Sequence, residues 1–298
     1  MKVLNFGSMN IDYVYQMEHF IQPGETFASS GLTLGCGGKG LNQSIALARA
    51  GAEVYHACKI GAEGGFLVDK LKEMGVDTRF VVPGEGNCGH AIIQVTPDGQ
   101  NCIILYGGTN MQMTEDFVDS VLAEFCAGDV LVLQNELNLI PYMIERAYAK
   151  GMRIAFNAAP FTAAVPDYPL DKLTWLVVNE VEGAALAQTD DLAQVPDLLR
   201  RKYPGTNVLL TMGREGCLYC GTDGQRIRCD AITVEAVDTT AAGDTHFGYF
   251  IRGILDGMTV EKALHLASVA SGIAVTRPGA ADSVPGYEEV ISSVYYKG

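Results

Sequence analysis

Basic residues are scarce in this sequence. Its 298 residues contain 21 lysines and arginines against 35 aspartates and glutamates, which gives a formal net charge of -14 at pH 7. A groove for nucleic acid requires a basic face, and an anionic membrane surface attracts basic segments, so neither partner is expected. A local basic pocket for phosphate remains compatible with this charge, because net charge describes the whole chain and not one site.

Long apolar runs are absent as well. No segment approaches the roughly 18 uninterrupted apolar residues of a membrane helix. Residues 1–10 are short and strand-like, so no signal peptide is expected. The eight cysteines are scattered through apolar segments and show no disulfide spacing, which predicts a reduced, cytoplasmic setting. Cys217 and Cys220 form the one CxxC pair, and without a further pair or nearby histidine we interpret them as core residues.

A dinucleotide fingerprint is missing too. The strand expected at residues 2–6 is not followed by GxGxxG, which disfavours an NAD-dependent enzyme. From Thr114 onward strands and helices alternate, an order typical of parallel strands with crossover helices. Helices are expected at about 114–125, 141–149, 180–187 and 191–202, and strands at about 129–134, 153–157, 174–178 and 207–212. We therefore predict a doubly wound α/β fold, with residues 1–298 forming one domain.

A small second sheet is expected outside this alternation. Residues 91–95 and 102–106 flank the turn Thr96-Pro97-Asp98-Gly99, which predicts a hairpin. We expect segments at about 12–34 and 88–106 to form a sheet that stands off the main body and covers a substrate as a lid. A plain surface hairpin would have the same pattern.

A stretch of small residues precedes a helix near the carboxyl end. Residues 232–237 alternate like a strand, and apolar side chains recur at helical spacing after Asp244. The backbone N–H groups of residues 241–243 would lie at the helix start, where unpaired donors and the helix dipole favour a phosphate. Asp244 would then face the incoming group as a proton acceptor. The alternative is an ordinary capped helix whose first turn carries a favourable aspartate.

A second glycine-rich stretch, Gly37-Gly38-Lys39-Gly40-Leu41-Asn42-Gln43, also opens a helix. It is not a Walker A loop, because Thr33 stands at the first glycine position and Gly40 at the Ser/Thr position. It is either a tight turn or a backbone that approaches a ligand closely, with Lys39 and Asn42 as polar contacts.

Together these motifs resemble the ribokinase-like (PfkB) family of carbohydrate kinases. The glycine-rich stretch is similar to the family's amino-terminal sugar-binding signature, and Asp238-Thr239-Thr240-Ala241-Ala242-Gly243-Asp244-Thr245 to its carboxyl-terminal signature. Further landmarks in order are Asn10-Ile11-Asp12, Gln134-Asn135-Glu136, Asn179-Glu180-Val181-Glu182 and Thr211-Met212-Gly213-Arg214-Glu215-Gly216. The resemblance implies a three-layer α/β/α fold with a doubly wound, mostly parallel sheet and a small β-sheet lid.

The resemblance implies phosphoryl transfer from ATP to a sugar hydroxyl, with Mg²⁺ at the phosphates and K⁺ as a monovalent activator. Asp244 corresponds to the catalytic base, and the backbone of Ala241, Ala242 and Gly243 to the anion hole. The positions that match sugar-binding residues are Asn10, Asp12, Gly38, Lys39, Gly40, Asn42, Glu136 and Asp244. Those that match ATP-binding residues are Asn179, Glu182, Thr211, Gly213, Gly216, Gly243 and Ser268, with Glu182 near the magnesium. Those that match the monovalent-cation site are Asp238, Thr240, Ala274, Arg277, Gly279 and Ser283.

Several alternatives stay open at this point. Asn179 followed three residues later by Glu182 is also a helix-capping pattern. Departures from the family pattern at Cys88, Thr109 and His246 put the identity of the sugar in doubt, with ribose as the first expectation. The rivals are a kinase of the same fold acting on another sugar or a nucleoside, and a catalytically silent sugar-binding protein. The resemblance also leads us to expect a homodimer that forms through the lid.

Overall fold

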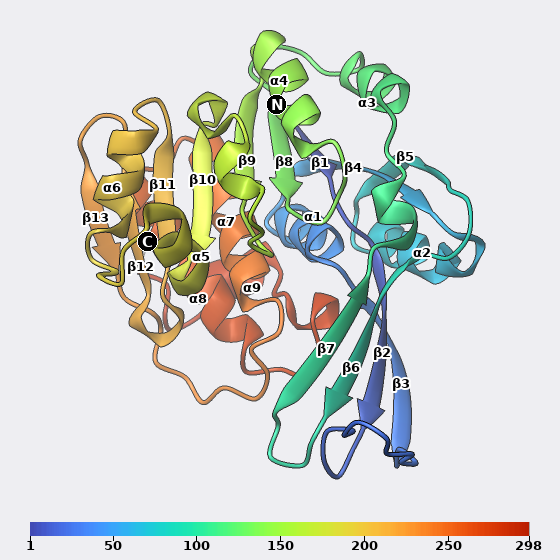
Figure 1. Cartoon of the computed structure of the whole chain (residues 1–298). Coiled ribbons are helices and arrows are strands. Elements are labelled where there is room, and N and C mark those ends of the chain that lie inside the picture. Colours follow the sequence, from blue (N-terminus) through green and yellow to red (C-terminus); the bar gives the residue numbers. More distant parts are fainter. Residues whose placement is uncertain (298) are drawn as a thin grey trace.

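The computed structural model describes residues 1–297, in which helices cover both faces of a nine-stranded sheet and a four-stranded sheet projects from one end (Figure 1). The large sheet has the spatial order β13 (Arg226–Cys229), β12 (Cys217–Cys220), β11 (Asn207–Thr211), β10 (Trp175–Asn179), β9 (Arg153–Asn157), β8 (Val130–Gln134), β1 (Lys2–Phe6), β4 (Glu53–Ile60) and β5 (Asp77–Pro83). The seven strands from β11 to β5 pair in parallel, and β12 and β13 extend the sheet antiparallel. This confirms the predicted doubly wound, mostly parallel sheet.

The strand order reverses at β1. From β1 the chain moves through β4 to β5 on one side, and it then returns to β8 on the other side and continues to β11. Ligands of open α/β sheets bind at the carboxyl ends of strands where the order reverses. In this chain that point lies beyond Phe6 and Gln134, the last residues of β1 and β8.

The two directions of winding place the helices on opposite faces, because crossovers between parallel strands are right-handed. One layer contains α1 (Lys39–Arg49), α2 (Gly65–Glu73), α7 (Ala242–Leu255), α8 (Val260–Ala274) and α9 (Tyr287–Ile291). The other contains α3 (Glu115–Leu122), α4 (Ile140–Ala149), α5 (Glu180–Ala187) and α6 (Val195–Lys202). In residues 1–297 no helix has both the length and the apolar character that crossing a bilayer requires.

The helices α1 and α7 pack closely because one of them lacks a side chain at the contact. A Cβ on Gly248 of α7 would lie 2.5 Å from the Cβ of Ala46 in α1. Side chains at both helix starts can therefore meet, although Lys39 and Asp244 are about 200 residues apart in the sequence.

One predicted strand is wrong. Residues 232–236 have no regular secondary structure, and the chain bends at Val237. Ile232 and Val234 are partly buried while Thr233 and Glu235 are exposed, and Ile232 lies against Gly272 of α8. The alternation therefore does not come from pairing in a sheet; it coincides with the partial burial of Ile232, against α8, and of Val234.

The small sheet contains β3 (Gly31–Gly37), β2 (Asn10–Gln16), β6 (Gly89–Val95) and β7 (Asn101–Tyr106), in that order. The predicted hairpin is present as β6 and β7, which are antiparallel, and β6 pairs in parallel with β2. In Figure 1 this sheet extends away from the large sheet, below β1 and β4.

The register of the small sheet gives its two faces different chemistry. One row across the four strands is Leu34, Tyr13, Ile92 and Ile104, and Leu34 and Ile104 at its ends are each 59% exposed. We call the face that carries this row the outer face. The adjacent row, on the opposite face, is Gly35, Asp12, Ala91 and Leu105, so Asp12 has small neighbours on both sides.

Candidate active site

The candidate site begins where α1 starts against the end of β1. A Cβ on Gly40 would lie 2.2 Å from the backbone nitrogen of Ser8, and one on Gly38 would lie 2.9 Å from the Ser8 carbonyl oxygen. Gly38 also has a φ of 95°, which disfavours any side chain. The glycines are therefore required for a tight turn that packs against the chain following β1, which supports the first of the two interpretations, and the turn presents Lys39 and Asn42 beside that chain.

Glu136 connects this helix start with the end of β8. Its Oε2 accepts a hydrogen bond from the backbone N–H of Lys39 at 3.0 Å and another from the Ser8 hydroxyl. Burial raises the pKa of Glu136, although these hydrogen bonds and the Lys39 charge oppose the rise. A carboxylate that is held in this way has a defined orientation.

Asp12 lies close enough to Glu136 for their charges to interact. Burial first, and the Glu136 charge second, raise the pKa of Asp12 to about 6. In the part of the chain that the structure describes, the Asp12 carboxylate accepts no hydrogen bond from another residue, so its acceptors are open to a ligand that donates hydrogen bonds. Asn10 on the same strand accepts from Asn110 at 2.7 Å, and Asn110 also binds the backbone of Met9. Asn110, which follows Thr109, was not among the predicted site residues.

Asp244 lies in the first turn of α7 and meets the first turn of α1. It is 6% exposed, and its two carboxylate oxygens accept from side-chain amides, Oδ1 from Gln43 at 2.9 Å and Oδ2 from Asn42 at 3.2 Å. The Asp244 charge is the largest cause of the raised pKa of Lys39, which burial opposes. The Lys39 ammonium is thereby stabilised between Asp244 and Glu136.

The start of α7 presents unpaired backbone donors. Ala241 precedes the helix with a left-handed backbone (φ 58°), and no side chain caps it. The Ala242 N–H donates to the Thr239 carbonyl at 3.2 Å and that of Thr245 to Ala241 at 2.8 Å. Among residues 1–297, the N–H groups of Gly243 and Asp244 have no hydrogen-bond partner, and a Cβ on Gly243 would meet only open space. An anion at this helix start would meet two free donors and no side chain.

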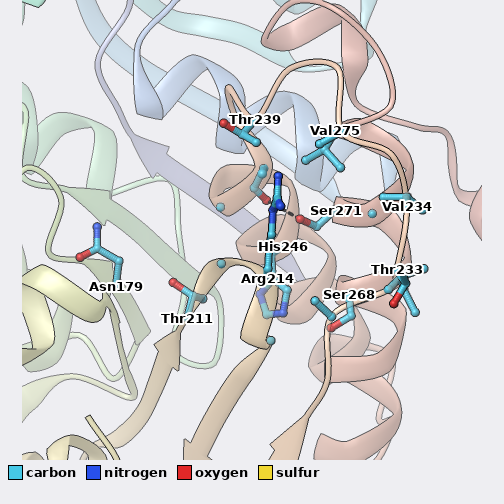
Figure 2. Close-up of a pocket in the computed structure, with 18 of the residues that line it drawn as sticks. Asn179, Thr211, Arg214, Thr233, Val234, Thr239, His246, Ser268, Ser271 and Val275 are labelled. Atoms are coloured by element: carbon cyan, nitrogen blue, oxygen red, sulfur yellow. Dashed lines mark hydrogen bonds between the residues drawn. The ribbon is translucent and has the colours of Figure 1, made fainter. Parts of the chain in front are cut away.

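A cavity of about 890 Å³ opens on the other side of Gly243, within the usual size range of small-molecule sites. Figure 2 shows Asn179 and Thr211, at the ends of β10 and β11, opposite Ser268, Ser271 and Val275 of the α8 region. The predicted ATP-binding residues that line this cavity are Asn179, Thr211, Gly213, Gly216, Gly243 and Ser268. Sequence reasoning missed Arg214 and the extended segment 231–236 as lining residues.

Glu182 is the one predicted ATP-binding residue that does not line the cavity. It closes a capping box with Asn179: each side chain accepts from the other's backbone N–H at 2.9 Å. The capping interpretation of this pair is therefore confirmed. The other oxygen of Glu182 has no hydrogen-bond partner within residues 1–297, which leaves one carboxylate oxygen to interact with a cation near the phosphates.

Three of the six residues predicted for a monovalent cation, Asp238, Thr240 and Gly279, are joined by hydrogen bonds between two loops. Asp238 Oδ1 accepts from the Thr240 N–H at 2.9 Å and from its hydroxyl at 2.6 Å, while Oδ2 accepts from the Gly279 N–H at 2.9 Å. Partial burial opposes these hydrogen bonds, but they lower the pKa of Asp238. The backbone N–H of Arg277 binds the Ala274 carbonyl, and Ser283 follows in the same loop. Asp238 thus ties the loop before α7 to the loop after α8.

His246, one turn into α7, lines the cavity (Figure 2). Both ring nitrogens are buried without a hydrogen-bond partner in residues 1–297. Burial lowers the pKa of His246 to about 4, so the ring is neutral at pH 7. Buried polar atoms without partners destabilise a fold, and replacing them with an apolar group of similar shape removes that cost.

Comparisons with known proteins agree with this geometry. Residues 1–286 match the family model described as pfkB family carbohydrate kinase. A ribokinase of Staphylococcus aureus (strain COL) is 35% identical over 301 residues, covering 97% of this chain and 98% of its own length. A ribokinase from Cryptococcus neoformans var. grubii serotype A, solved with ADP, superposes with a TM-score of 0.85 at 32% identity, covering 97% of this chain and 98% of its own. Arabidopsis thaliana ribokinase, solved with ribose and ATP, has a TM-score of 0.87 at 27% identity and coverage of 97% of both chains.

The buried histidines predict a loss of stability in acid. The pKa values of His56 and His246 are both lowered to about 4 by burial, whereas a histidine in the unfolded chain titrates near 6.5. Between these values only the unfolded state binds the proton, so the free energy of unfolding falls as pH drops from about 6.5 to 4, by up to roughly 3 kcal/mol per histidine. The raised pKa of Asp12 acts with the opposite sign, because the folded state gains the proton first as pH falls through about 6.

The variant His246→Phe removes the contribution of one of these two histidines to the loss of stability in acid. In urea unfolding at a series of pH values, it should be at least as stable as the native protein at pH 7 and lose less stability between pH 6.5 and 4.5. Parallel stability curves for the two proteins would contradict this account of His246.

Proposed function

Because the chain belongs to the pfkB family of carbohydrate kinases, we propose that it transfers the γ-phosphoryl group of ATP to a hydroxyl of ribose. One observation carries the proposal: Gly243 and Asp244 lie at the junction of two sites. Gly243 lines the large cavity, and Asp244 contacts Asn42 on the side of Lys39 and Glu136. A donor and an acceptor of a phosphoryl group would meet at this junction. The ADP, ribose and ATP bound to the related ribokinases support the choice of ligands.

The sugar binds on the side of the small sheet. A pentose presents several hydroxyl groups, each of which donates and accepts hydrogen bonds. Asp12 and Glu136 supply acceptors, and Lys39 and Asn42 supply donors. The small sheet then acts as a lid, since Asp12 lies on its inner face and would close against the sugar and exclude water.

Asp244 takes the proton from the attacking hydroxyl. The hydroxyl oxygen forms a bond to the γ-phosphorus, the bond from that phosphorus to the β,γ-bridging oxygen breaks, and ADP leaves. The backbone of residues 241–243 forms the anion hole that stabilises charge on the transferring group, with the free N–H groups of Gly243 and Asp244 as its donors. Such transfer depends on positioning and charge stabilisation more than on covalent chemistry. The Lys39 ammonium adds a fixed positive charge beside the reacting groups.

Two cations complete the proposal. Mg²⁺ would neutralise charge on the nucleotide phosphates, with Asn179 and Glu182 nearby; Mg²⁺ in nucleotide sites is held by one or two carboxylates and the phosphates themselves. K⁺ would lie among Asp238, Thr240, Ala274, Arg277, Gly279 and Ser283, several of which act through backbone carbonyls. Since Asp238 already ties these loops together, the ion would further order the loop that leads into the anion hole.

A silent sugar-binding protein would not need a buried carboxylate beside free backbone donors and a nucleotide-sized cavity. We therefore favour turnover over binding alone. We further propose that the protein is a homodimer formed through the outer face of the small sheet, where Leu34 and Ile104 are exposed, because exposed apolar patches mark interaction surfaces. A cytoplasmic location, predicted from the cysteine pattern, agrees with eight free thiols.

The proposed activity predicts the outcome of a substrate screen. ADP released from ATP and Mg²⁺ is quantified by chromatography with pentoses, hexoses and nucleosides, each with and without KCl at constant ionic strength. Ribose should give the highest kcat/KM. The kcat/KM for ribose should be higher with K⁺ than in a buffer that contains neither Na⁺ nor K⁺. A nucleoside turned over faster than every sugar, or no sugar-dependent ADP release at all, would overturn the proposal.

Two aspartates should separate catalysis from binding. Asp244→Asn keeps the shape but not the proton acceptor, so kcat should fall by about 10²- to 10⁴-fold, while the ribose Kd measured by calorimetry changes little. Asp12→Ala removes an acceptor for sugar hydroxyls and should raise the ribose Kd by about 10- to 100-fold with a smaller effect on kcat. Retained turnover in Asp244→Asn would exclude Asp244 as the base.

The dimer proposal is tested by sedimentation velocity at micromolar concentration. The native protein should sediment as a dimer and Ile104→Asp, on the outer face, as a monomer. Val181→Asp is the matched control, since Val181 on α5 is an exposed apolar residue (76%) far from the small sheet in sequence. A monomeric native protein would refute the proposal.

A further inference from the structure

A row of buried polar side chains runs from Asp244 into the protein core. Its members Gln43, Gln134, Asn5, Ser44 and His56 are all 0% exposed. Polar groups are costly to bury unless they are hydrogen-bonded, so a continuous row of five in the core requires an explanation. Two of the members, Gln43 and Ser44, belong to α1, and the others lie at β1, β4 and β8.

Near Asp244, the donor and the acceptor of each hydrogen bond in the row can be assigned. A carboxylate only accepts, so the Gln43 amide nitrogen faces Asp244 Oδ1, at 2.9 Å. The Gln43 carbonyl oxygen then points away and accepts from Gln134 Nε2 at 2.7 Å. Gln134 Nε2 gives its second hydrogen to Asn5 Oδ1 at 3.0 Å. Gln134 is therefore a branch point that donates toward Asp244 on one side and toward Asn5 on the other.

The second branch ends on the backbone. Asn5 Nδ2 donates to the Ser44 hydroxyl and to the Gly40 carbonyl, each at 2.8 Å. Ser44 contacts His56 Nδ1 at 2.8 Å, and His56 Nε2 contacts the Gly7 carbonyl at 3.1 Å. Because the ring is neutral and the Gly7 carbonyl only accepts, Nε2 carries the hydrogen and Nδ1 accepts from Ser44. This branch joins α1 to β1 and β4 and never reaches Asp244 except through Gln134.

The orientation of the Gln134 side-chain amide leaves its oxygen without a hydrogen bond. Its Oε1 is buried without a partner in residues 1–297. A flipped amide would give Oε1 no donor either, since it would face the oxygens of Gln43 and Asn5. The unpaired oxygen is thus the consequence of presenting two hydrogens, one of which orients Gln43 toward the carboxylate.

We propose that Gln43, oriented by Gln134, is a positioning residue that fixes the Asp244 carboxylate for proton transfer. Gln43 occupies Oδ1 from the core side, which leaves Oδ2, bound at the longer distance of 3.2 Å by Asn42, as the oxygen that meets the sugar hydroxyl. The inference rests on the proposed role of Asp244 as the base. Neither Gln43 nor Gln134 touches sugar or nucleotide in this scheme, so each acts on kcat and not on binding.

Gln43→Met and Gln134→Met remove the branch that reaches Asp244 with side chains of similar length. Because a small misplacement of a reacting group costs about 10²-fold in rate, each variant should lower kcat by roughly 10- to 100-fold, while the KM values for ribose and ATP stay within about threefold of the native ones. Ser44→Ala is the matched control, since it breaks only the branch that ends on the backbone. It should lower the free energy of unfolding and leave kcat close to native.

An unfolding curve is measured for every variant, so that kcat is compared only between folded proteins. If Gln43→Met does not fold, Gln134→Met is used in its place. If Asp244→Asn abolishes turnover but both methionine variants keep native kcat, the positioning role is refuted and the proposed function survives. If Asp244→Asn itself keeps turnover, the proposed function fails first. Equal losses of kcat in Ser44→Ala and the methionine variants, or raised KM values with native kcat, would also refute the positioning role.

Discussion

The contact between the Asp244 carboxylate and the amides of Asn42 and Gln43 is the interaction on which this active site depends. It joins the first turns of α1 and α7, and both turns begin in glycine-rich or small-residue loops with no capping side chain. Helix starts without caps expose backbone donors. Bringing two of them together, with one carboxylate between them, creates a place where an anion and a hydroxyl can meet while the aspartate keeps its orientation.

One ammonium partly offsets the negative charge of the carboxylates around this contact. Lys39 lies among Asp244, Glu136 and Glu182, and their charges raise its pKa against the effect of burial. A single buried ammonium among several carboxylates remains charged, because each neighbour favours the protonated form. The site therefore contains a fixed positive charge although the chain as a whole has a net charge of -14.

Much of this arrangement could be predicted because it follows from local pattern. Glycines at Gly38 and Gly40, small residues before Asp244, and the hairpin turn at Thr96-Pro97-Asp98-Gly99 each have a backbone requirement that a sequence displays directly. An alternating pattern is not specific to strands: residues 232–237 alternate in polarity, but they form no strand, and Ile232 packs against α8 instead. The strands β5 and β13 were not predicted, and Asn110 became visible as a site neighbour only through its contacts with Met9 and Asn10.

By itself the sequence determined the class of fold, the two helix starts and the residue types that a sugar kinase requires, because turn chemistry and hydrophobic periodicity act over a few residues. Only the tertiary structure decided which of these groups meet. The pairing of Gln43 with Asp244 spans 201 residues, and the branch at Gln134 joins β8 to α1 through the interior. Hydrogen bonds between distant segments depend on how the sheet and helices pack. The spacing of residues along the chain does not show which distant residues this packing brings together.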